Sequence, residues 1–230
     1  VRKLQPEHER FETPYLADAA ALARAAPDRQ GDEDAVVLSD LKVTRVHPSG
    51  LSSTYVPQVV KVFTPRGADQ LRGHAIGYAP GRQEVRVERA RVWKPDGSSV
   101  EAHQESDRST SEPWYRLYYD TRARVVGFPA LQPGDVLELA WRSDDVTSEN
   151  LLSDYFGELH ALAGPVRKLR VDYVLLVPEG RRIFSNDLSL PGLQRSDRAL
   201  PGGVHEHRWT ARDLPRLEPE PGMPGPTETS

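Results

Sequence analysis

Hydrophobic and polar residues alternate along most of this chain, in short runs separated by turns rich in proline and glycine. A period of two is typical of strands that bury one face. About ten strands are predicted, from runs at 35–46, 54–63, 71–78, 83–93, 99–103, 115–119, 122–128, 135–141, 155–162, 169–177, 181–185 and 204–210. Several are apolar on one face only, so the fold class is mainly β, an antiparallel β-sandwich.

Three of these runs carry more detailed predictions. The run Gln83–Trp93 changes phase in its middle, so a β-bulge near residues 88–89 is needed to keep one face buried. Pro57 cannot donate a ladder hydrogen bond, which predicts an edge strand or a bulge there. The run Leu169–Val177 becomes apolar on both faces, which predicts a strand at the centre of the structure. The polar stretch 104–113 is expected to be an exposed loop, and the polar stretch 142–153 is expected to be turn-like.

Helical spacing is confined to the N-terminal region, over 13–26. Thr13 suits the N-cap and Pro14 the first helical position. The apolar face of this helix is mostly alanine and would bury little area. The pattern divides the chain into an N-terminal helix with an acidic linker (1–33), a β-sandwich domain (34–213) and an extended Pro-rich C-terminal linker (214–230).

Composition narrows the function further. The 230 residues include no cysteine and carry a formal net charge of −4, with acids and bases interspersed. This excludes disulfides and cysteine nucleophiles, and it argues against nucleic acid as a partner. No apolar run approaches the roughly 20 residues of a membrane helix, so direct membrane insertion is not expected. The chain begins at Val1 without an initiator methionine, and we expect an excised piece or a processed product.

Catalytic motifs are not evident. The chain shows no nucleophile elbow, phosphate loop, dinucleotide fingerprint or zinc-protease helix. We therefore predict no catalytic residues and no cofactor. His205 and His207 are weak metal candidates, since both imidazoles share one face of a strand but no third ligand lies at motif spacing. Asp144-Asp145 is better interpreted as a turn than as a calcium site.

Two further groups of side chains could bind a partner. Trp114, Tyr115, Tyr118 and Tyr119 form an aromatic cluster beside a polar loop, which could stack on sugars or contact a protein if it is exposed. Ordinary sandwich core is the alternative. The basic groups at 167–170 and 181–182 are more simply explained as a solvated face than as an anion site.

A series of short motifs follows in a fixed order along the chain. They are Asp34-Ala35-Val36-Val37-Leu38, Ile76-x-Tyr78, Val85-x-Val87-x-x-Ala90-x-Val92, Lys94-Pro95-Asp96-Gly97, Phe128-Pro129-x-Leu131-x-Pro133-Gly134-Asp135-Val136, Tyr155-Phe156-Gly157, Pro165-Val166, Val177-Pro178-Glu179-Gly180, Trp209-x-x-x-Asp213-Leu214-Pro215 and Glu218-Pro219-Glu220. In this order they resemble a bacterial domain of unknown function found directly N-terminal to transglutaminase-like domains. The resemblance spans Asp34 to Pro224.

The resemblance implies a β-sandwich somewhat similar to the N-terminal β domain of zinc aminopeptidases. It implies a parent protein that is exported or envelope-associated, so a periplasmic or cell-envelope location is favoured for the parent. A transglutaminase-like, cysteine protease-like domain would follow in the same chain and be its partner. The expected function is that of a non-catalytic accessory domain. The alternative is an independent module that binds polysaccharide or protein through the aromatic cluster.

Overall fold

The computed structural model describes residues 10–101, 103–110, 120–146, 155–186, 190 and 192–218. In these residues the strands are β1 (Ala35–Val46), β2 (Ser52–Val62), β3 (Gly73–Tyr78), β4 (Gln83–Trp93), β5 (Ser99–Val100), β6 (Gln104–Ser109), β7 (Arg122–Gly127), β8 (Val136–Asp145), β9 (Lys168–Pro178), β10 (Gln194–Leu200) and β11 (Val204–Leu214). The helices are η1 (Thr13–Tyr15), α1 (Ala19–Arg24) and α2 (Pro65–Leu71). The predicted mainly β fold with a short N-terminal helix is confirmed.

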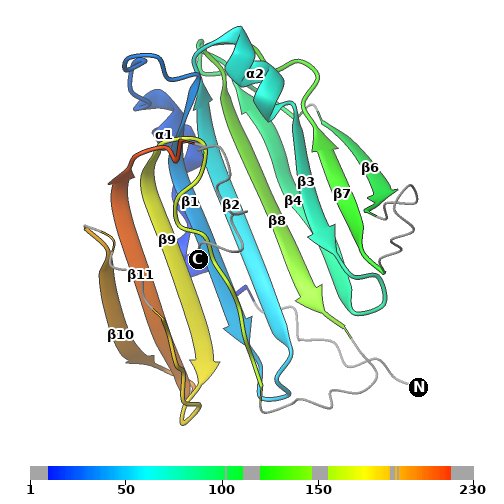
Figure 1. Ribbon diagram of the computed structural model, residues 1–230, viewed down its shortest axis with the longest axis vertical. Coiled ribbons are helices and arrows are strands. Elements are labelled where there is room, and N and C mark those ends of the chain that lie inside the picture. Colours follow the sequence, from blue (N-terminus) through cyan, green and yellow to red (C-terminus); the bar gives the residue numbers. More distant parts are fainter. Residues whose placement is uncertain are drawn as a thin grey trace.

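The strands form two sheets (Figure 1). One has eight strands in the order β10-β11-β9-β1-β2-β8-β4-β5, and the other has three in the order β3-β7-β6. Neighbouring strands are antiparallel, apart from β1 and β9, which run parallel. The predicted central strand at 169–177 is β9, which is hydrogen-bonded between β1 and β11.

The large sheet is covered on both faces. On its front face, Ile76 of β3 and Val126 of β7 pack against Leu137 and Leu139 of β8, so the small sheet covers β2, β8 and β4. Residues 155–166 cover β1, β9 and β11 on the same face, where Phe156 joins a cluster of buried residues of these strands. On the back face, α1 and the residues before it pack on β1 and β2 (Figure 1).

The predicted helix over 13–26 is wrong in its first half. Thr13–Tyr15 form one 3-10 turn, Leu16 is extended with ψ 136°, and α1 begins only at Ala19, with Asp18 as the N-cap. A tertiary contact explains the break, because the Tyr15 hydroxyl donates a hydrogen bond to the Glu206 carboxylate of β11. Contact with the sheet here overrides the local helical pattern.

The bulge predicted in β4 is confirmed, since the register with β8 shifts between Val87 and Arg89. The prediction for Pro57 is wrong. β2 lies between β1 and β8, and its register with β8 is continuous through Pro57. The pairing with β1 instead passes from Asp40 with Gln58 to Val43 with Tyr55, so the proline lies where that ladder is interrupted. A proline that donates no ladder bond is therefore tolerated inside the sheet.

Several polar segments differ from prediction. Residues 104–109 were expected to be a loop but form β6, an exposed strand held to β7 by ion pairs from Arg124 to Glu105 and Asp107. β8 continues to Asp145, beyond the predicted end, and the polar strand β10 was not predicted. The runs 155–162 and 181–185 were predicted as strands, and neither contains one. The predicted strand at 115–119 and the extended tail beyond residue 218 lie outside the described residues.

Candidate functional site

The aromatic cluster predicted as a binding site lies outside the described residues, because Trp114, Tyr115, Tyr118 and Tyr119 all fall within 111–119. The residues on either side of this segment belong to the described part of the structure. The Thr110 hydroxyl donates to the Thr121 carbonyl over 3.0 Å, which brings the two flanks of the segment together.

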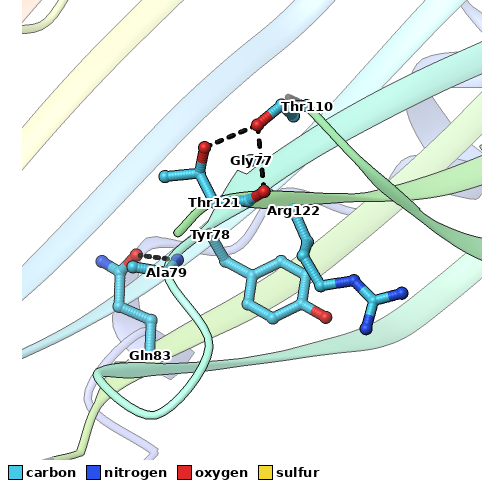
Figure 2. Close-up of a pocket in the computed structure, with 7 residues that line it drawn as sticks. All are labelled: Gly77, Tyr78, Ala79, Gln83, Thr110, Thr121 and Arg122. Carbon is cyan, nitrogen blue, oxygen red and sulfur yellow. Dashed lines mark hydrogen bonds between the residues drawn. The ribbon is translucent and has the colours of Figure 1, made fainter. Parts of the chain in front are cut away.

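A hollow of about 540 Å³ lies beside this point, between the ends of β3 and β7. Figure 2 shows Tyr78 and Arg122 side by side on its wall, with Thr110 and Thr121 above them and Gln83 opposite. The Tyr78 hydroxyl already donates to Asp107 over 3.1 Å. The hollow is open and offers a ring and a guanidinium group for contact.

A deeper groove of about 670 Å³ lies on the front face of the large sheet, between residues 155–162 and 181–186. Its floor includes Tyr173 of β9 and Trp209 of β11, which are paired across the two strands and stack with ring centroids 5.3 Å apart. Leu175 and Leu193 complete an apolar surface around them. The volume lies within the roughly 300–1,000 Å³ typical of ligand sites.

Glu158 anchors one wall of the groove to the sheet. Its carboxylate accepts hydrogen bonds from the Tyr173 hydroxyl over 2.7 Å and from the Thr44 hydroxyl over 3.0 Å, and it forms an ion pair with Lys42. Burial and the negative charge of Glu158 raise the pKa of Tyr173. Two hydroxyl donors and the charge of Lys42, from β1 and β9, thus satisfy this carboxylate and hold the 155–162 segment on the sheet.

His160 lies on the same segment and faces the groove. Its ring packs on Tyr173 with centroids 5.0 Å apart, and its Nε2 is buried without a hydrogen-bond partner. Burial, together with the positive charge of Lys42, lowers the pKa of His160 to about 4. The imidazole is therefore neutral at physiological pH.

The structure brings the two metal candidates together but adds no third ligand. The rings of His205 and His207 lie 4.8 Å apart, and Nδ1 of His207 is 2.6 Å from the Asp197 carboxylate. Within the described part of the chain, no group of three histidine, aspartate or glutamate side chains could hold a metal ion. The pair remains a weak candidate for metal binding, on the face of β11 that also carries Trp209.

Ion pairs account for Asp144 and for the basic group at 167–170. Asp144, predicted to lie in a turn, is instead a buried residue of β8 whose carboxylate accepts from Arg142 over 3.0 Å. The basic group at 167–170 is dispersed, since Arg167 pairs with Asp213 and Lys168 with Asp40. Arg181 and Arg182 line the groove.

The groove residues were not found from sequence as a site. Residues 155–157 belong to a family motif, and together with His160 they lie in the run 155–162 that was predicted to be a strand. The polar residues beside Phe156 are the local sequence signal that could have indicated a binding site here. Two of the three partners of Glu158, Lys42 and Thr44, are more than a hundred residues away on β1, and no local pattern connects them to it.

The two-sheet fold defines a mainly β domain. Comparison with known proteins identifies the family to which this domain belongs. The chain belongs to the family described as "Domain of Unknown Function with solved-structure structure (DUF3857)", whose model matches residues 48–218. No curated protein matches the chain at a significant level. No helix in the described residues has the length and apolar character needed to cross a membrane.

Comparison with solved structures found matches at low sequence identity. A protein described as a "putative protease" from Parabacteroides distasonis ATCC 8503 matches with a TM-score of 0.70 and 18% identity, over 83% of this chain and 38% of that one. The M1 zinc metallopeptidase from Deinococcus radiodurans matches with a TM-score of 0.36 and 13% identity, over 78% of this chain and 39% of that one. This chain therefore spans well under half the length of either protein.

Proposed function

We propose that this chain is a non-catalytic accessory domain of a longer bacterial protein, beside a transglutaminase-like, cysteine protease-like module in the same parent. The observation that carries the proposal is the match to a protein described as a "putative protease", of which this fold makes up only 38%. The missing cysteine supports it, since a papain-type nucleophile cannot come from this chain. The motif resemblance supplies the class of the neighbouring module and favours a periplasmic or envelope location for the parent.

The gene of the parent protein tests this proposal. We expect the reading frame to continue beyond Ser230 into a segment with cysteine, histidine and aspartate in papain-like order. Removal of this domain from the parent should then weaken its activity on polypeptide substrates more than on a small model substrate. A stop codon shortly after Ser230 would refute the proposal.

A second candidate function is an independent module that binds polysaccharide or protein through the aromatic residues of 111–119. It is favoured by the hollow in Figure 2, which lies where the two flanks of that segment meet. The double variant Trp114→Ala, Tyr118→Ala should abolish retention on glycan arrays or on partner proteins. Unchanged retention would dismiss these residues as the binding site.

A further inference from the structure

The groove above Tyr173 and Trp209 combines an apolar floor with large exposed side chains at its rim. Phe184 is 84% exposed and Tyr155 is 65% exposed, whereas most large apolar side chains among the described residues are buried. Exposed aromatic side chains around a concave apolar surface mark an interaction site. An apolar side chain of a ligand would gain burial against this floor.

The charges around the groove favour an anionic partner. Arg182 is exposed at the rim, with its guanidinium 5.3 Å from the centroid of the Phe184 ring. Among the described residues that line the groove, Glu158 is the carboxylate, and Lys42 neutralises it. The surface is thus locally basic on a chain whose formal net charge is −4, and a ligand with carboxylates would complement it.

His160 closes part of the groove and is not a contact for a ligand. Its ring packs on Tyr173, and its Nε2 is buried and out of reach of the groove. The contacts available to a ligand are therefore the apolar floor and the arginine at the rim.

A sugar fits these observations less well. The exposed rings of Tyr155 and Phe184 could stack on a sugar, but sugar recognition also needs polar groups with spare hydrogen-bonding capacity. On the floor, Trp209 is only 6% exposed, and the Arg195 guanidinium lies 5.0 Å from its ring centroid. The carboxylate of Glu158 already accepts from three donors. The groove therefore offers apolar contact and positive charge, which suit a peptide.

We propose that this groove binds an extended acidic segment of polypeptide, with an apolar side chain over Tyr173 and a carboxylate beside Arg182. The inference deepens the proposed accessory role and rests on it only for the idea that the parent acts on polypeptides. The site would then hold the acidic flank of a protein substrate while the neighbouring module acts on another part of it.

Binding to the isolated chain tests this inference. The probe is a short fluorescein-labelled peptide with one phenylalanine flanked by glycine and glutamate, followed by fluorescence anisotropy. Two matched peptides carry lysine in place of glutamate, or serine in place of phenylalanine. We expect the acidic phenylalanine peptide to bind at least about tenfold more tightly than either. Equal binding of all three, no binding, or binding of chito-oligosaccharide alone would overturn the inference.

Two charge-reversal variants locate the site. Arg182→Glu should weaken binding of the acidic peptide about tenfold. Arg122→Glu is the matched control, because Arg122 is also an exposed arginine and lies beside the other hollow. Both positions are exposed, so both variants should keep the wild-type melting temperature. Loss of binding in Arg122→Glu but not in Arg182→Glu would assign the peptide to the hollow in Figure 2 and refute the groove.

The peptide-binding inference and the proposed accessory function can fail independently of each other. Peptide binding is measured on this chain alone, whereas the accessory role depends on the gene beyond Ser230. Failed binding would leave the accessory role standing, and a gene that ends there would leave a measured peptide site without a neighbouring module.

Discussion

Two segments cover opposite faces of the large sheet, and both are anchored by a glutamate. Residues 10–26 cover the back face, where Glu12 reaches Arg142 of β8 over 3.5 Å. Residues 155–166 cover the front face, where Glu158 reaches Lys42 of β1. The first pair is almost fully buried, at 2% and 5% exposure of the side chains, whereas both side chains of the second are 17% exposed.

The neighbours of each anchor explain this difference. Phe11 packs against Arg142, with the guanidinium 4.8 Å from its ring centroid, and is itself buried. The back face is closed at this point. Beside Glu158 lie His160 and the groove, with the exposed Phe184 at its rim. The same type of anchor therefore serves a closed packing contact on one face and leaves an open, ligand-sized space on the other.

The largest expected effect comes from breaking the closed anchor. Arg142→Leu would leave the carboxylates of Glu12 and Asp144 buried without this partner. Removing one member of a buried ion pair costs about 3–5 kcal/mol, so the free energy of unfolding in urea should fall by that amount. Arg72→Leu removes an exposed pair with Asp69 and should cost less than about 1 kcal/mol. Similar losses in both variants would contradict the closed packing of the back face.

The second prediction uses pH to test burial of His160. Its pKa is about 4 in the folded protein and 6.5 in the unfolded chain, so the unfolded state binds more protons between these values. Stability from this group is present above pH 6.5 and is lost as pH falls toward 4, by about 2 kcal/mol at pH 5. Charges near the ring are Lys42, Asp40, Glu158 and Lys168.

Urea unfolding of the wild type and of His160→Phe at pH 7 and pH 5 measures this loss. Other titrating groups contribute to both proteins, so the difference between them isolates His160. We expect the variant to lose about 2 kcal/mol less than the wild type on acidification. Parallel losses would show that the imidazole is solvated and the groove is more open than described.

A matched pair of substitutions gives the third prediction. Glu158→Gln keeps an acceptor for Tyr173 and Thr44 but removes the charge that faces Lys42. We expect a loss of about 1 kcal/mol in the free energy of unfolding, because this pair is partly solvated. Glu12→Gln should cost at least about twice as much at its more buried site. The reverse order would mean that the front face carries the more important anchor.

Local patterns were sufficient for some of the fold and insufficient for the anchors. The phase change in β4 predicted its bulge, and the apolar second half of β9 predicted its central place, because both are properties of one strand. β6 was not predicted, because its side chains are all exposed and show no alternation. Only its pairing with β7 defines it as a strand. The contact from Glu12 to Arg142 joins residues 130 positions apart, and only the folded topology brings them together.

The smallest expected effect concerns Phe184 at the rim of the groove. A side chain that is 84% exposed loses little contact when it is truncated, so Phe184→Ala should change the free energy of unfolding by less than about 0.5 kcal/mol. Phe11→Ala is the matched control on the closed face, where a buried phenylalanine costs about 3–5 kcal/mol. If the groove is a binding site, Phe184→Ala should nevertheless weaken binding of the acidic peptide, since the rim loses its aromatic contact. A large loss of stability with unchanged binding would make Phe184 a packing residue and erase the contrast between the two faces.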